Sequence, residues 1–152
     1  ERGITAQFLG PDGLDSSELA KLAGDALEGT YYTTVAAPVS NFPNAAQYAT
    51  DYQAKYNGSA PSFSAQAYDA ASFCSAAIVK ATVDAKAKPT REQVLAALKS
   101  LPALDGITST YKFNDKGDPD PATYYIFTAN TDPAKWDANV LASKIESAPP
   151  SN

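Results

Sequence analysis

The sequence contains no histidine and no methionine, and it has one cysteine in 152 residues. Histidine is the commonest general acid or base near neutral pH, so its absence excludes catalytic triads of the Ser-His-Asp and Cys-His kinds. A single cysteine excludes an internal disulfide and a zinc cluster. Cys74 lies in an alanine-rich helical pattern, which predicts a small buried apolar side chain. We therefore expect no catalytic residue, no metal site and no cofactor. An enzyme that uses carboxylates or tyrosine hydroxyls is the weaker hypothesis.

Basic residues and long apolar runs are also scarce. There are 12 lysines and arginines against 17 acidic residues, a net charge of −5, and we expect no nucleic-acid partner because such a surface repels phosphates. No apolar stretch approaches the roughly 20 residues that span a bilayer. The first residues are Glu1, Arg2 and Gly3, without an initiator methionine. We interpret this start as a cut, so the lack of a signal peptide says nothing about compartment.

The segment from Phe8 to Leu14 is the most informative in the chain. Ile4–Leu9 reads as a short strand, and Gly10-Pro11-Asp12-Gly13 follows it as a turn. The next residues form a capping box, which predicts a short helix. Asp12 and Gly13 thus stand at the carboxyl end of a strand, where open α/β sheets hold small ligands. The alternative is that Asp12 is a plain turn residue that caps the next helix.

One more strand and three helices are predicted next. Gly29–Ala37 is rich in residues that suit a strand. Asn44 is predicted to cap the first helix, which closes at Gly58. Ser64 is predicted to cap the second, which reaches about Val83, and the third has a capping box at Thr90. We expect the second helix to turn one set of residues inward, namely Tyr68, Ala71, Ile78 and Val79.

The hydrophobic period then changes from 3.6 to 2. Ile107–Phe113 alternates as a half-buried strand, Asn114–Asp118 is a polar turn, and Tyr124–Thr128 is a second strand, which together predict a hairpin. Periodicity alone leaves two architectures open. One is a single sheet, and the other is a pair of lobes that the chain visits in turn, crossing near Val35–Pro38 and Leu104–Ile107.

Four segments carry a resemblance to a known family. In order and at similar spacings, the chain resembles the C-terminal portion of the type I periplasmic solute-binding proteins of bacterial ABC importers, in particular the branched-chain amino-acid (Leu/Ile/Val) binding family. The segments are Gln7–Gly13, Leu22–Thr30, Ala67–Ala70 and Phe113–Asp118.

The resemblance implies an α/β fold with two Rossmann-like lobes joined by three crossovers and a ligand in the cleft. The chain would supply only the C-terminal part of both lobes. Residues 1–34 would form a strand-helix-strand segment of the C-terminal lobe, residues 35–106 a crossover and the helices of the N-terminal lobe, and residues 107–152 the C-terminal-lobe hairpin and a tail.

The resemblance also implies ligand-binding residues. In the family, an acid at the strand end faces the ligand's α-ammonium group, and Asp12 occupies that position with Gly13 beside it. Aspartate in place of the family's glutamate shortens the reach by one methylene group. An aromatic residue five positions before a helix tyrosine lines the side-chain pocket of relatives, and here Phe63 stands five before Tyr68.

The implied function is that of an extracytoplasmic solute-binding component of an ABC importer, periplasmic or extracellular, which binds a branched-chain or similar amino acid. The implied partners are the small-molecule ligand, a membrane permease of the importer and the missing N-terminal portion of the same protein. Two alternatives use the same fold: a ligand-sensing receptor ectodomain, and a binding protein for an aromatic acid, amide or urea.

Overall fold

The computed structural model describes residues 5–148, and the chain divides there into two compact units. The first unit comprises residues 5–37 and 123–147, and the second comprises residues 38–122 and Ala148. The lobe assignment of 1–34, 35–106 and 107–152 stays a prediction, but residues 107–122 fall in the same unit as the helices before them.

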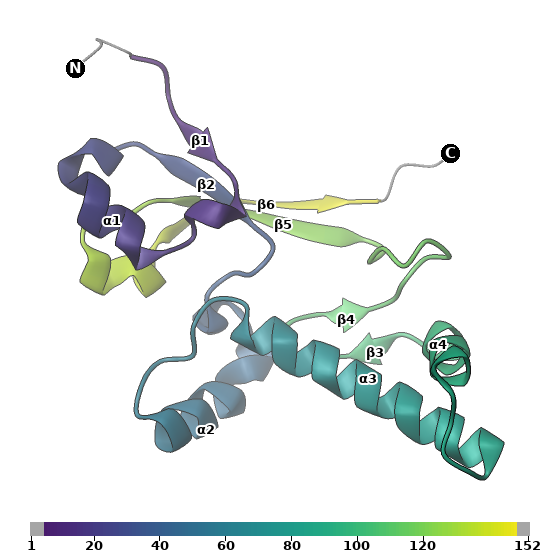
Figure 1. The fold of residues 1–152 in the computed structure, drawn as a ribbon. Helices are drawn as coiled ribbons and strands as arrows, with labels where there is room; N and C mark the ends of the chain where they lie inside the picture. The colour runs from purple at the N-terminus through teal and green to yellow at the C-terminus, as the bar shows by residue number, and fades with distance from the viewer. Residues whose placement is uncertain (1–4, 149–152) are drawn as a thin grey trace. The chain divides into compact units, whose positions relative to one another are not determined.

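The first unit is built on a four-stranded sheet with the order β1-β2-β5-β6 (Figure 1). Strands β1 and β2 are parallel and β2 and β5 antiparallel, with Tyr31 opposite Thr128. Helix α1 packs against a 3-10 segment that connects β5 and β6. The strands are β1 (Leu9–Gly10), β2 (Tyr31–Thr34), β5 (Ala122–Thr128) and β6 (Val140–Ser147); the helical segments are α1 (Ser17–Ala23) and 3-10 turns at Asp12–Leu14, Gly24–Leu27 and Pro133–Ala138.

Both predicted strands of the first unit are shorter than their sequence patterns. The predicted strand Ile4–Leu9 is reduced to Leu9–Gly10 in the described residues, and Ile4 lies outside them. Strand β2 ends at Thr34 because the Thr34 side chain accepts a hydrogen bond from the Ala36 amide, 3.0 Å away, and turns the backbone. Local side-chain bonding therefore ends β2 early.

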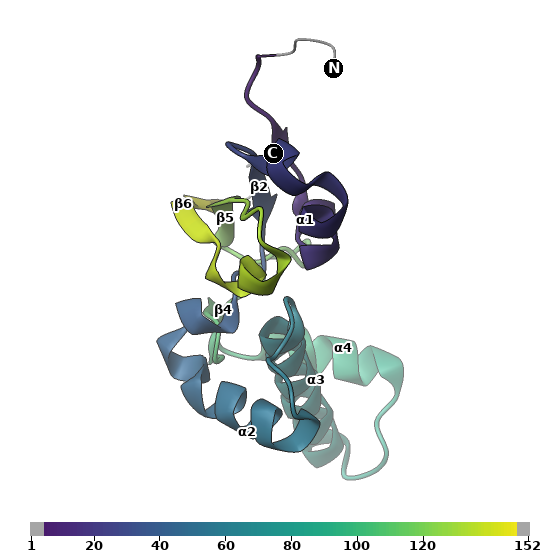
Figure 2. The same ribbon diagram turned by 90° about the vertical axis from the view of Figure 1, so that its left-hand side faces the viewer.

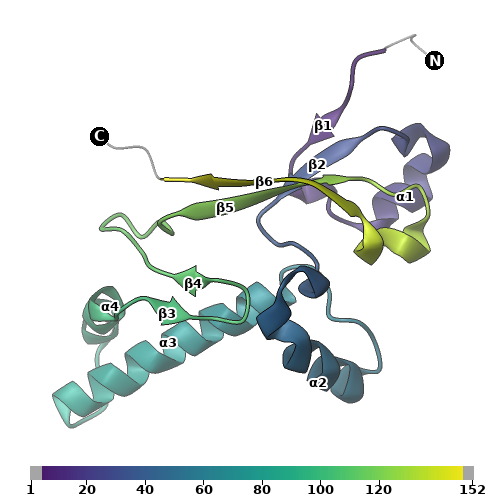
Figure 3. The same ribbon diagram turned by 180° about the vertical axis from the view of Figure 1, so that it is seen from behind.

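The second unit places a small two-stranded sheet along its longest helix (Figures 1 and 3). Helices α3 and α4 pack together (Figure 2), and the ring of Phe73 on α3 meets that of Tyr111 on β4 edge to face at 5.5 Å. The helices are α2 (Ala46–Tyr56), α3 (Ser64–Ala85) and α4 (Arg91–Ser100), with 3-10 turns at Val39–Asn41 and Pro43–Ala45; the strands are β3 (Leu104–Asp105) and β4 (Thr110–Tyr111).

The hairpin predicted between Ile107–Phe113 and Tyr124–Thr128 is wrong. Strand β4 pairs with β3, whereas β5 pairs with β2, far away in the sequence. The alternating segment forms a strand only at Thr110–Tyr111, because the Gly106 amide bonds the Ser109 carbonyl (2.8 Å) and closes a tight loop before it. The polar turn at Asn114–Asp118 does form, closed by a hydrogen bond from the Asn114 amide to the Asp118 carbonyl.

Helix α3 turns a different face inward from the predicted one. Its buried positions recur every four residues, at Asp69, Phe73, Ala77 and Ala81. The residues predicted to face inward are exposed, and so is Cys74, which the sequence predicted to be buried; they are Tyr68, Ala71, Ile78 and Val79. Ile78 and Val79 lie outside the buried stripe and are exposed, whereas the ring of Tyr68 contacts that of Tyr48 on α2, with 5.3 Å between the centroids.

The helix starts also differ in part from their predictions. The capping box at Thr90 is confirmed, with both reciprocal bonds between Thr90 and Gln93 present. Helix α2 begins at Ala46 after a 3-10 turn that contains Asn44, so Asn44 is not its cap. Ser64 is the first residue of α3 instead of its cap, and Phe63 holds the cap position.

Candidate functional site

Asp12 lies on a tight turn directly after β1. The turn closes through hydrogen bonds from the Leu14 amide to the Pro11 carbonyl (3.1 Å) and from the Asp15 amide to the Asp12 carbonyl (2.9 Å). Gly10 gives the Leu14 side chain room to pack over the turn, because a Cβ atom there would stand 2.0 Å from a Leu14 methyl group and would force that side chain to move. The Asp12 side chain is exposed, and within residues 5–148 it makes no hydrogen bond or ion pair. It is thus available to an external cation.

Gly13 has no structural reason within this turn to be glycine. Its φ lies outside the left-handed region, and a Cβ atom would meet nothing within 4 Å. Any residue would fit the turn, so its conformation does not explain this glycine. Asp12 and Gly13 present an open carboxylate and an open backbone side by side.

Phe63 precedes helix α3 in a strained conformation. Its φ is 68° and its ψ −11°, a left-handed backbone that an aromatic residue rarely adopts. The turn around it closes through the Ser64 amide and the Pro61 carbonyl, 3.1 Å apart, and the side chain is 41% exposed. Such strain is concentrated at functional sites. Phe63 belongs to the second unit, whereas Asp12 and Gly13 belong to the first.

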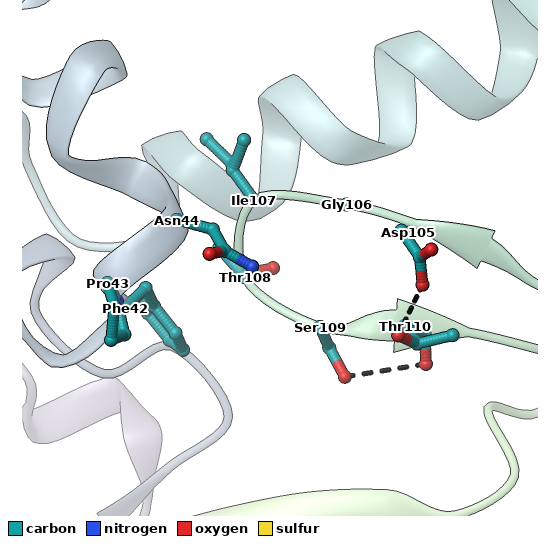
Figure 4. Close-up of a pocket in the computed structure, with 9 residues that line it drawn as sticks. All are labelled: Phe42, Pro43, Asn44, Asp105, Gly106, Ile107, Thr108, Ser109 and Thr110. Atoms are coloured by element: carbon teal, nitrogen blue, oxygen red, sulfur yellow. Dashed lines mark hydrogen bonds between the residues drawn. The ribbon is translucent and has the colours of Figure 1, made fainter.

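Sequence reasoning did not find a hollow of about 400 Å³ within the second unit (Figure 4). One wall is the chain before α2, at Phe42–Asn44, and the other is the loop from Asp105 to Thr110 that joins β3 and β4. Asp105 accepts a hydrogen bond from the Thr110 hydroxyl at 2.6 Å across the mouth of this loop. The signal that was available is the run of small and polar residues from Asp105 to Thr110, which an alternating strand pattern concealed.

Groups that could hold a metal are absent from the part of the chain that the structure describes: no three His, Cys, Asp or Glu side chains cluster there. Within the same residues, no helix has the length and apolar character needed to cross a membrane.

Comparison with known families identifies the architecture. The sequence model of one family, described as periplasmic binding protein, matches residues 1–134. The chain belongs to this family. The α/β fold of type I periplasmic binding proteins, of which the chain covers only a part, is thereby confirmed as the fold class.

Among curated proteins, the chain is similar to the Leu/Ile/Val-binding protein homolog 1 of Brucella suis. It is 28% identical over 127 residues, which are 84% of this chain and 32% of the relative. Homolog 2 of Brucella abortus is likewise 28% identical over 127 residues, with the same coverage of both chains. The chain spans about a third of the length of these relatives.

Solved structures of substrate-binding proteins are also similar to this chain. A fatty acid ABC transporter substrate-binding protein from Thermomonospora curvata has a TM-score of 0.72 at 26% identity, covering 96% of this chain and 38% of its own. A leucine-binding protein from Thermotoga maritima has a TM-score of 0.70 at 23% identity, covering 94% and 38%. The second likeness supports the fold alone.

Proposed function

We propose that this chain is part of the extracytoplasmic solute-binding component of an ABC importer, and that the whole protein binds a branched-chain or similar amino acid without catalysis. The observation that carries the proposal is Asp12, a carboxylate with no partner among the described residues at the carboxyl end of a parallel strand. The curated relatives are named Leu/Ile/Val-binding proteins. A periplasmic or extracellular location and delivery to a membrane permease follow from this reading.

Asp12 suits the cationic end of such a solute. A carboxylate that hydrogen-bonds an ammonium group contributes about 1.5–3 kcal/mol of binding free energy. The unconstrained Gly13 beside it lets the ligand approach the backbone closely. Phe63 is 41% exposed and offers a ring for an aliphatic side chain, and its left-handed backbone is of the costly kind that gathers at functional sites.

The rest of a longer protein would complete the solute site, and we propose that it covers the bare side of α3. Ile78, Val79 and Val83 form an exposed apolar side of this helix. Monomeric soluble proteins rarely leave contiguous apolar surface open. The relatives are about three times as long as their matched segments, so a family chain has enough additional residues to pack there.

A binding protein for an organic acid is the second candidate. It is favoured by the fatty acid binding protein from Thermomonospora curvata, which is 26% identical to this chain, and a further structural relative is described in complex with benzoate. Asp12 separates the two candidates, because a carboxylate attracts the ammonium group of an amino acid and repels the anion of a fatty or aromatic acid.

The test is isothermal calorimetry on the full-length protein with leucine, isoleucine, valine, octanoate and benzoate. Asp12→Ala is expected to weaken amino-acid binding by about 2–5 kcal/mol, because the ligand's ammonium group is left without its partner. Asp25→Ala is the matched control, since Asp25 is an exposed acid on a 3-10 turn of the same unit. An unchanged dissociation constant would remove Asp12 from the site, and binding of octanoate or benzoate alone would favour the second candidate.

A further inference from the structure

Asp69 is the most deeply buried acid among the described residues, at 2% exposure, and it lies on the inward face of α3. All its bonds go to one loop. One carboxylate oxygen accepts from the Ile107 amide at 2.8 Å, and the other accepts from the Thr108 amide at 2.9 Å and from the Thr108 hydroxyl at 2.5 Å. No basic side chain in residues 5–148 pairs with it. Three donors from the loop 106–109 thus stabilise a buried negative charge.

The loop is shaped to reach this carboxylate. A Cβ atom at Gly106 would stand 2.5–2.7 Å from the carboxyl atoms of Asp69, so only glycine permits the approach. The Thr108 hydroxyl also meets the Tyr111 hydroxyl at 2.6 Å. The ring of Tyr111 packs on Phe73, one helical turn after Asp69. Polar and aromatic contacts from one stripe of α3 therefore hold the same hairpin.

The loop that Asp69 holds is also a wall of the hollow. Residues 105–110 form one side of it, facing Phe42–Asn44, while Asp69 itself does not line it (Figure 4). The amides of Ile107 and Thr108 point to Asp69, so the backbone between them has one orientation. The side chains of Ser109 and Thr110 follow from that orientation and face the hollow.

We propose that Asp69 is a positioning residue, whose carboxylate fixes the loop 106–109 against α3 and thereby sets the wall of the hollow formed by residues 105–110. Gly106 is the second part of this arrangement, because the absence of a side chain there leaves the space in which the carboxylate lies. This role concerns a place other than the turn that bears Asp12, and it does not depend on which solute the protein binds.

The device is tested by amide hydrogen exchange, followed by NMR on the full-length protein. Asp69→Ala removes both acceptors, so the amides of Ile107 and Thr108 should each exchange at least about tenfold faster. Asp69→Asn keeps one acceptor oxygen, so one of the two amides should stay protected and the other should not. Thr108→Val removes only the hydroxyl and should leave both amides protected. Gly106→Ala should make both amides exchange faster.

Asp84→Asn is the matched control, because Asp84 is an exposed acid on the same helix, paired with Lys80 at 2.8 Å. This control should leave the exchange rates of both the Ile107 and the Thr108 amide unchanged. A split between the Ile107 and Thr108 amides in Asp69→Asn is a signature that general destabilisation does not produce. If Asp69→Ala fails to fold, Asp69→Asn and Thr108→Val still decide the matter. Equal protection of both amides in Asp69→Asn, or uniform loss of protection throughout α3, would overturn the proposal.

A second readout follows the hollow itself. With Cys74→Ser as background, a spin label at Ser109→Cys reports the mobility of the loop, because Ser109 lines the hollow and is exposed. Adding Asp69→Asn should sharpen the spectrum toward a mobile label, whereas adding Asp84→Asn should not. An unchanged spectrum with Asp69→Asn would show that another contact fixes this wall.

Discussion

The two units bury very different side chains. The first encloses large aromatic rings: Tyr32 stacks between Phe127 at 5.8 Å and Trp136 at 5.5 Å, and all three are buried. The second buries mostly alanines along the seam of α3 and α4. Because burial energy scales with apolar area, each buried ring of the first core contributes more to stability than each buried alanine of the second. Both units leave large apolar side chains exposed, such as Leu22 at 86% in the first and Val83 at 67% in the second, so the contrast lies in what each unit buries.

Several polar groups of the first core hydrogen-bond one another, although the second carboxylate oxygen of Asp15 is buried without a partner. The Asn139 side chain donates to the Tyr32 hydroxyl at 2.9 Å and accepts from the Asn130 amide at 2.9 Å. The Trp136 indole donates to Asp15 at 3.0 Å. Tyrosine and tryptophan supply large area with a polar end that needs a partner when buried. This network joins residues on either side of the second unit in the sequence.

Phe127→Ala should have the largest effect on the free energy of unfolding. The side chain is 0% exposed, so its loss should lower the free energy of unfolding by about 3–5 kcal/mol through lost burial and a cavity. Tyr124→Ala, an exposed position on the same strand, is the control and should cost much less. Urea denaturation measures both. A cost below about 1 kcal/mol for Phe127→Ala would mean that the aromatic core is not what holds the first unit.

Local chemistry was predictable from the sequence, and long-range pairing was not. The capping box at Thr90 involves four consecutive residues and was recognised in full. Strand β5 has the strand pattern that was expected, but its partner is β2, and no local signal specifies a partner that distant in sequence. Strand β6 was missed because every residue in Val140–Ser147 is exposed, so it lacks the alternation that marks a half-buried strand.

For the candidate site too, local features could be predicted from the sequence and long-range contacts could not. The turn at Asp12 was predictable because Gly10 and Pro11 encode it locally. Asp69 was visible only as part of a family motif, since its role depends on a loop that starts 37 residues later in the chain at Gly106. The strained backbone of Phe63 could not be read from sequence, because left-handed conformations are typical of glycine and asparagine.

Tyr32→Phe is a smaller perturbation of the aromatic core, and it should change how the stability of the protein depends on pH. Burial raises the pKa of the Tyr32 hydroxyl well above its ordinary value near 10. At a pH above about 10 the unfolded chain loses this proton, whereas the folded chain keeps it, so the stability of the folded state falls as the pH rises. Tyr32→Phe should cost about 1 kcal/mol at neutral pH through the lost bond to Asn139. It should also reduce the alkaline loss of stability, measured by denaturation at pH 8 to 11. Tyr56→Phe, an exposed position, is the control.

The smallest effect on the 152-residue chain is expected at the bare side of α3. Val79→Ser with Val83→Ser should change its free energy of unfolding by about 0.5 kcal/mol or less, because both side chains are exposed. In the full-length protein the same pair should cost several times more, since we propose that further chain covers this side and valine burial contributes about 1.5–3 kcal/mol per residue. Ala77→Ser is the control, because Ala77 is buried in this chain already and should cost the same at both lengths. Equal costs for the valine pair at both lengths would mean that this surface stays exposed in the full-length protein.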